Sequence, residues 1–241
     1  MAQQFKARIA FVSCGSATRT HYGSMGPVIP NDVSVEFQGL DLYGNNLYEI
    51  EGKKNLIVQK TRELVNTYHW DGIMVTAAPP EVLNPGLYND LRTLLPIPVT
   101  TALHACVAAL RAVSASRVLL LTPFDERLNK LICDHLSKEG VTALAPRPFQ
   151  NLGDAIRLKP EEVFDHTKSA LNEVGQVEAV YFQGAVLDPI KVLGRIESEL
   201  KTTVVASNPS MLWFMLSKLG LSYHIDGYGK LLASWPALTE R

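Results

Sequence analysis

The chain has 241 residues, of which 46% are hydrophobic and 20% are charged, values that are ordinary for a globular protein with a substantial core. Its formal net charge is −1 and no long basic or acidic run occurs, which argues against nucleic acid or an anionic membrane surface as the main partner. The longest apolar stretches, such as Val118–Leu121 and Met211–Leu216, are too short to span a bilayer.

Short β-branched runs alternate with longer stretches of helical period, which is the pattern of a parallel α/β architecture. The expected strands are Ala7–Ser13, Val33–Phe37, Gly72–Thr76, Pro98–Thr101, Arg117–Pro123, Val141–Arg147, Ala179–Gln183 and Thr202–Ser207. The expected helices include Leu56–Tyr68, Asp125–Lys138, Lys159–Val174, Ile190–Leu200 and Pro209–Leu219. Two acids open the helix at Asp125, where they suit the positive end of the helix dipole, and Gly220 is a candidate C-cap for the last helix.

The order of these elements repeats along the chain. A strand, a turn, a helix, a second strand and a second helix follow one another from Ile73 and again from Val180. We therefore expect an α/β fold of two pseudo-symmetric halves, each a mainly parallel sheet flanked by helices, with the active site in the cleft between them. The first half is expected to take residues 1–101 and 208–241, and the second residues 102–207.

The loops that leave the strand ends are the expected site, because ligands of open α/β sheets bind beyond the carboxyl ends of the strands. Small and hydroxylated residues gather there, which suits the close approach of backbone N–H groups to a ligand. These loops are Ser13–Thr20, Thr76–Glu81, Thr122–Glu126, Gln183–Ala185 and Ser207–Ser210.

Three segments resemble the arylmalonate decarboxylase and maleate isomerase branch of the aspartate/glutamate racemase superfamily. The first, from Pro98, contains a strand, a helix, an Arg-Val strand opening and Thr-Pro-Phe with Asn129 five residues beyond the phenylalanine. The others are Val204–Trp213 (VVASNPSMLW) and Gly227–Leu232 (GYGKLL). The resemblance covers nearly the whole chain, most clearly from about Pro98 to Leu232.

The resemblance implies that hydroxyls and backbone amides hold a carboxylate-bearing substrate between the halves and stabilise an enediolate. Racemases of the superfamily use one cysteine from each half as bases, and the decarboxylase uses one. The corresponding positions here, about Thr76–Ala77 and Gln183–Gly184, hold no cysteine, and Phe124 stands where the decarboxylases have a tyrosine. Neither Thr76 nor Gln183 can deprotonate a carbon acid near neutral pH, so racemisation by two bases is not expected.

Two residues are candidates for the missing proton chemistry. Cys14 ends the first strand, and the amides of Gly15 and Ser16 are expected to depress its pKa, so that it acts as acid or nucleophile. The alternative is a small cysteine packed at a strand end. His104 is the reserve catalytic candidate, and its alternative is a histidine that caps or packs between helices. Cys106 and Cys133 are expected in the core.

The substrate-binding candidates share a position at a strand end, and their alternative role is local capping. They are Gly15, Ser16, Thr76, Ala77, Thr122, Phe124, Gln183, Gly184 and Ser207. Asn129 is expected to hold the loop of Thr122 from one helical turn deeper. Arg19 and His21 belong either to a lid over an anionic substrate or to a solvated loop.

The sequence favours a cofactor-free lyase that decarboxylates a small carboxylic or dicarboxylic acid through an enediolate-like intermediate. The alternatives are a cis/trans or keto–enol isomerase of a small carboxylic acid, and a non-catalytic member that binds a small carboxylate. No metal or organic cofactor is predicted, because neither a ligand cluster nor a nucleotide-binding motif occurs. Three cysteines without metal spacing and no signal-peptide pattern predict a cytoplasmic protein, and a homo-oligomer is possible.

Overall fold

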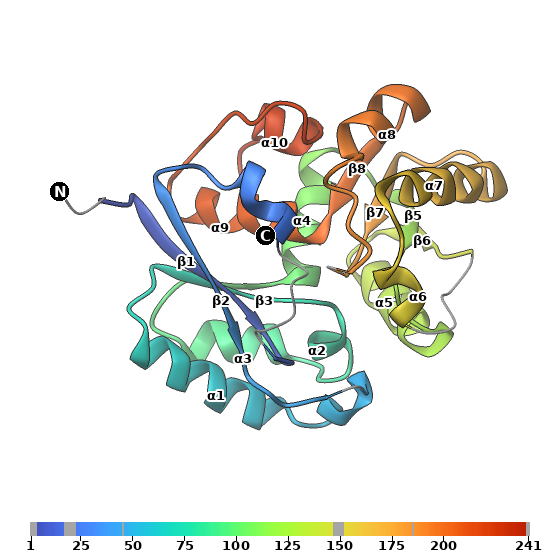
Figure 1. The fold of residues 1–241 in the computed structure, drawn as a ribbon. Coiled ribbons are helices and arrows are strands. Elements are labelled where there is room, and N and C mark those ends of the chain that lie inside the picture. The colour runs from blue at the N-terminus through green and yellow to red at the C-terminus, as the bar shows by residue number, and fades with distance from the viewer. Residues whose placement is uncertain (1–3, 17–22, 45, 147–151, 185, 240–241) are drawn as a thin grey trace.

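In the part of the chain that the structure describes, eight strands form two four-stranded sheets in which every strand pair is parallel, so the expected α/β fold of two similar halves is confirmed (Figure 1). The strand order is β2-β1-β3-β4 in the first sheet and β6-β5-β7-β8 in the second, so the two sheets repeat one topology. The strands are β1 (Ala7–Ser13), β2 (Val33–Gly39), β3 (Gly72–Val75), β4 (Val99–Thr101), β5 (Arg117–Leu121), β6 (Thr142–Leu144), β7 (Ala179–Phe182) and β8 (Thr203–Ala206).

The computed structural model describes residues 4–16, 23–44, 46–146, 152–184 and 186–239. Several expectations fall outside these ranges: the lid residues Arg19 and His21, the strand end at Arg147, and Ala185 in the loop after β7.

Helices cover both sheets (Figure 1). They are α1 (Lys54–Thr67), α2 (Pro79–Val82), α3 (Leu87–Leu94), α4 (Ala102–Ala112), α5 (Glu126–Lys138), α6 (Leu152–Ile156), α7 (Pro160–Val174), α8 (Leu193–Leu200), α9 (Ser207–Lys218) and α10 (Lys230–Ser234), with short 3-10 helices η1 (Gly23–Val28) and η2 (Leu47–Ile50). Within the described ranges, no helix has the length and apolar character that a membrane crossing requires.

Local chemistry explains where the helices begin. Asp125 caps α5, as expected, because its carboxylate accepts a hydrogen bond from the Leu128 amide at 3.0 Å. The helix expected from Ile190 starts only at Leu193, because the preceding residues form a turn in which the Val192 amide donates to the Pro189 carbonyl at 2.8 Å.

The prediction that Ser207 ends a strand is wrong. β8 ends at Ala206, and Ser207 is the first residue of α9. Pro209 in the first turn is compatible with this early start, because the first helical N–H groups have no partner within the helix. Gly220, at φ 76°, follows the C-cap residue Leu219 rather than being the C-cap itself.

The core explains why several strands, such as β3 (GIMV) and β7 (AVYF), are apolar throughout. Along β5, Val118 and Leu120 join a large core that also contains residues of the first sheet, while Leu119 and Leu121 join a second core on the other face. This alternation follows from the two-residue period of a strand. Helix α4 packs along α9, and α4 lies between the two sheets (Figure 1), so one continuous core crosses both halves.

Parallel register aligns the strand ends. In the first sheet Val12 pairs with Val75, which pairs with Thr101, and in the second Phe182 pairs with both Leu121 and Ala206. The loops that follow these residues therefore leave from one edge of each sheet. This gathers the candidate site residues into two groups, one per half.

Candidate functional site

The two halves carry the same backbone feature directly after β3 and β7. The Thr76 amide donates to the Val12 carbonyl at 2.9 Å, and the Gln183 amide donates to the Leu121 carbonyl, also at 2.9 Å. The residue that follows has a positive φ in each case, 65° at Ala77 and 111° at Gly184. A left-handed alanine costs about 1–2 kcal/mol, and such strain clusters where a fold holds a ligand loop in place.

Gly184 is confined by the neighbouring loop. A Cβ atom at this position would lie 2.8 Å from Cδ of Pro123 and 3.3 Å from Cζ of Phe124. The Gly184 amide donates to the Ser207 hydroxyl at 3.4 Å. The loops that follow β5 and β7 therefore meet the start of α9 at this glycine, and three of the predicted substrate-binding residues lie together.

Gln183 carries a buried amide donor at the end of β7. Its side chain is fully buried, and its Oε1 atom accepts a hydrogen bond from the Tyr181 hydroxyl. Its Nε2 atom finds no hydrogen-bond partner among the described residues. Leaving such a group unpaired costs about 1–3 kcal/mol, which an acceptor on a bound molecule would recover.

The loop of Thr122 is held from below by Asn129, as predicted. The Thr122 hydroxyl donates to Oδ1 of Asn129, and Nδ2 of Asn129 donates to the Phe124 carbonyl at 3.1 Å. The Phe124 amide in turn donates to the Thr122 hydroxyl at 3.1 Å. This amide is therefore used within the loop, and substrate contact by Thr122 and Phe124 stays a prediction.

The expectation of a lowered pKa at Cys14 is wrong. The side chain is 1% exposed, and burial raises the pKa of the thiol to about 12. The Gly15 amide does not offset this, because it donates to the Ser13 hydroxyl at 3.1 Å. Cys14 is therefore a protonated thiol at neutral pH, a group that can give a proton but is not an activated nucleophile.

His104 lies in α4 and packs between α3 and α9. Its ring stacks on Tyr88 of α3 at 3.8 Å and meets Phe214 edge-on at 5.0 Å, and its Nδ1 atom is 3.1 Å from the Thr100 hydroxyl. It lines a pocket with Glu81. This pocket does not include Cys14, so the two catalytic candidates do not share it.

Glu81 is a buried acid that sequence reasoning missed. It accepts a hydrogen bond from the Thr101 hydroxyl, which also caps α4. Burial raises the pKa of Glu81 to about 7; the Thr101 hydroxyl lowers it and the charge of Glu139 raises it further. The sequence gives little signal for this, because an acid after Pro79 and Pro80 looks like an exposed first-turn residue.

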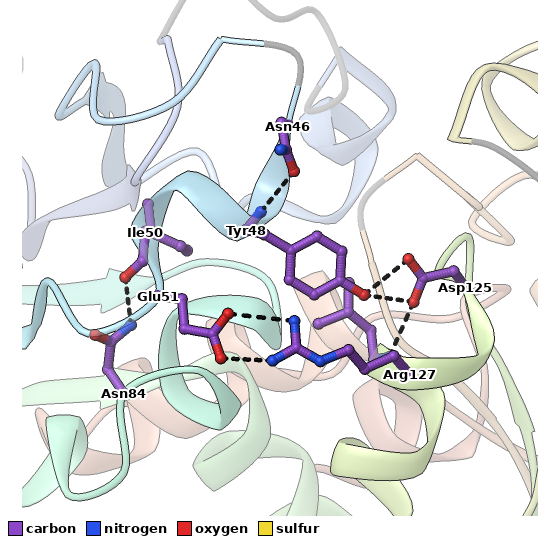
Figure 2. Close-up of polar contacts among 8 residues, drawn as sticks. Asn46, Tyr48, Ile50, Glu51, Asn84, Asp125 and Arg127 are labelled. Carbon is purple, nitrogen blue, oxygen red and sulfur yellow. Dashed lines mark hydrogen bonds and ion pairs between the residues drawn. The ribbon is translucent and has the colours of Figure 1, made fainter.

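A polar cluster joins the halves beside the loop that follows β5 (Figure 2). The Tyr48 hydroxyl of η2 donates to both carboxylate oxygens of Asp125, at 2.7 and 2.8 Å. The Arg127 guanidinium lies 4.6 Å from the Tyr48 ring centre and donates to Glu51 at 2.5 and 3.2 Å. Burial and the Asp125 hydrogen bond raise the pKa of Tyr48 to about 12, so the phenol keeps its proton.

The two halves are thus parallel α/β units of one topology, each with buried polar residues where its strands end. The arylmalonate decarboxylase family model matches residues 81–232. The chain belongs to this family.

Known proteins of two kinds are similar to it. A maleate isomerase from Alcaligenes faecalis is 27% identical over 141 residues, which are 57% of this chain and 54% of that protein, so the match spans about half the length of this curated relative. A mutant of arylmalonate decarboxylase in its liganded form superposes with a TM-score of 0.81 at 18% identity, covering 94% of this chain and 98% of that one. A Nocardia farcinica maleate cis-trans isomerase mutant with a covalently bound succinylcysteine intermediate gives 0.74 at 19% identity, covering 95% and 98%.

The Gly184→Ala variant should be about 2–3 kcal/mol less stable, because the new methyl group meets the Pro123 ring and the positive φ disfavours alanine. Urea unfolding measures this. Gly26→Ala is the control, since a Cβ there meets nothing within 4 Å. Equal stability of the two variants would contradict the close packing of the strand-end loops.

The Tyr48→Phe variant should lose about 1 kcal/mol of stability, because an exposed hydrogen bond between the halves disappears. Tyr68→Phe, at a ring that stacks on Trp70, is the matched control and should be neutral. Thermal unfolding of both variants checks this, and an unchanged Tyr48→Phe protein would show that the bond contributes nothing.

Glu81 should make stability fall as pH rises. The folded pKa of about 7 lies above the ordinary 4.5, so the contribution of Glu81 to the free energy of unfolding is complete below pH 4.5 and is lost, by about 3 kcal/mol, as the pH rises from 4.5 through 7. Relative to wild type, Glu81→Gln should lack this fall, whereas Glu126→Gln on the exposed start of α5 should retain it. Urea unfolding at pH 5 and pH 8 gives the comparison, and parallel wild-type and Glu81→Gln profiles would refute it.

Proposed function

We propose that the chain is a cofactor-free lyase that decarboxylates a small carboxylic or dicarboxylic acid through an enediolate-like intermediate. Membership of the arylmalonate decarboxylase family supports this reaction class. Loss of CO₂ needs no base, which agrees with the absence of cysteine at the two strand-end positions, Thr76 and Gln183. The intermediate needs hydrogen-bond donors where its negative charge develops.

The buried Gln183 amide is the observation that carries the proposal. Its Nε2 atom has no partner among the described residues, and the Tyr181 hydroxyl fixes the orientation of the amide through Oε1. A donor that is oriented before the substrate binds does not have to reorganise during the reaction. We assign to Gln183 the stabilisation of the enediolate oxygen, with Gly184 and Ser207 forming the backbone of the same cradle.

Cys14 is the proposed source of the proton that quenches the carbanion. Its thiol is protonated at neutral pH, since burial raises its pKa to about 12. An enediolate is a strong base, so a weak acid suffices to protonate it. The role assigned is therefore that of acid, with water as the substitute if the thiol is removed.

A cis/trans isomerase of a small unsaturated dicarboxylic acid is the second candidate. The similarity to maleate isomerases, one curated and two with solved structures, favours it. Against it stands the absence of a cysteine at the matching strand ends, since one such isomerase forms a covalent succinylcysteine intermediate.

To test this, the protein is dialysed against a chelator and then incubated with maleate and a panel of 2-substituted malonates. Proton NMR follows each reaction. We expect CO₂ loss from at least one malonate, and a decrease in kcat of about 10²-fold or more in Gln183→Met, which removes the donor in a similar volume. Gln176→Met, at an exposed position, is the control. Cys14→Ala should lower kcat by about 10²-fold, and Cys133→Ala should not.

The other outcomes separate the alternatives. Conversion of maleate to fumarate without CO₂ loss would replace the lyase by the isomerase. Saturable binding of malonates without turnover would indicate a non-catalytic carboxylate-binding protein. Full activity of Gln183→Met would remove the observation on which the proposal depends.

A further inference from the structure

The pocket that His104 and Glu81 line has a volume of about 380 Å³ and opens between α3, α4 and α5. This volume is within the range of small-molecule sites. Its inner wall contains Val107 and the stacked rings of Tyr88 and His104. Asp125 at the start of α5 belongs to the strand-end loop, whereas His135 in the pocket lies ten residues further, about 15 Å along the helix axis. The pocket is therefore separate from the strand-end cradle.

The charges at its rim favour an anion with one acid group. Arg111 is paired with Glu139, whose carboxylate is 2.7 Å from the guanidinium. Arg92 lies 5.8 Å from the Tyr88 ring centre and forms no ion pair with a carboxylate of the described residues. One exposed guanidinium is thus left to bind an acid group from outside.

The inner end of the pocket selects against a second acid group. Glu81 lines it, and this side chain is 9% exposed and held by the Thr101 hydroxyl. A ligand that brought another carboxylate to this end would face the Glu81 carboxyl in a poorly hydrated place. An uncharged body is favoured here.

We propose that this pocket binds a small monocarboxylic acid, with its carboxylate at Arg92 and its uncharged body against Val107 and the Tyr88–His104 pair. The site is assigned from its own residues and does not depend on the reaction catalysed at the strand ends. Glu81 lies five residues after Thr76, so α2 connects the pocket to the loop that follows β3.

Binding should weaken as Glu81 ionises. The charged and titratable groups that face the pocket are Glu81 of α2, Tyr88 and Arg92 of α3, His104 and Arg111 of α4, and His135 and Glu139 of α5. In the interior, Cys106 and Tyr181 interact electrostatically with Glu81. Both stay protonated, because burial raises their pKa. Burial likewise lowers the pKa of His135, which favours the neutral imidazole.

In the experiment, the full chain is titrated with benzoate, isophthalate and benzyl alcohol at pH 6 and at pH 8. The chemical shifts of its backbone amides in NMR spectra report binding. Benzoate should bind at least tenfold more tightly than either relative at pH 6, and about tenfold more weakly at pH 8. Arg92→Gln should weaken benzoate binding about tenfold, and Arg62→Gln, exposed on α1, should not. Glu81→Gln should remove most of the pH effect.

Shifted amides must lie on α3, α4 and the second half of α5. Benzoate binding that perturbs only residues around Gln183, or that is unaffected by Arg92→Gln, would place the ligand elsewhere and overturn the proposal. The proposal is also overturned if isophthalate or benzyl alcohol binds as tightly as benzoate. None of these results depends on turnover, so they stand apart from the test of the lyase.

Discussion

Parallel pairing in register is the constraint from which the rest of this molecule follows. Because the strands of each sheet run the same way and end level, every strand passes its chain into a loop at the same edge. The backbone groups in those loops have left the sheet hydrogen-bond pattern, so they must turn sharply or find a partner. Ala77 and Gly184 turn sharply with positive φ, and the Gly184 amide finds the Ser207 hydroxyl. The strand ends of each sheet therefore bring buried polar residues together at one edge.

The sequence predicted the strands well, for a physical reason. Strands buried on both faces read as continuous apolar runs, and this signal does not depend on distant residues. The first residues of the helices were harder to predict, because a helix start depends on which groups donate and accept hydrogen bonds within a single turn. The turn after Pro189 delays α8, and Ser207 enters α9 because a proline in the first turn does not prevent it.

The chemistry of single residues was harder to predict than their positions. Cys14 lies at the predicted strand end, yet its pKa moves upward because its surroundings, contributed by distant segments, exclude water. The residues around Glu81 in the sequence do not indicate whether its side chain is buried or exposed. Its burial depends on Thr101, twenty positions away, and on the packing of α2 against α5. Such effects belong to tertiary structure, and a local pattern does not contain them.

The continuous core across α4 and α9 has a mechanical consequence. Large movement of one half against the other would drag the side chains of these helices across each other, and closely packed interiors resist such sliding. A hinge-like closure of one half on the other is therefore not expected. The loops that follow β3, β5 and β7 lie outside this helix–helix contact, so their displacement leaves it intact.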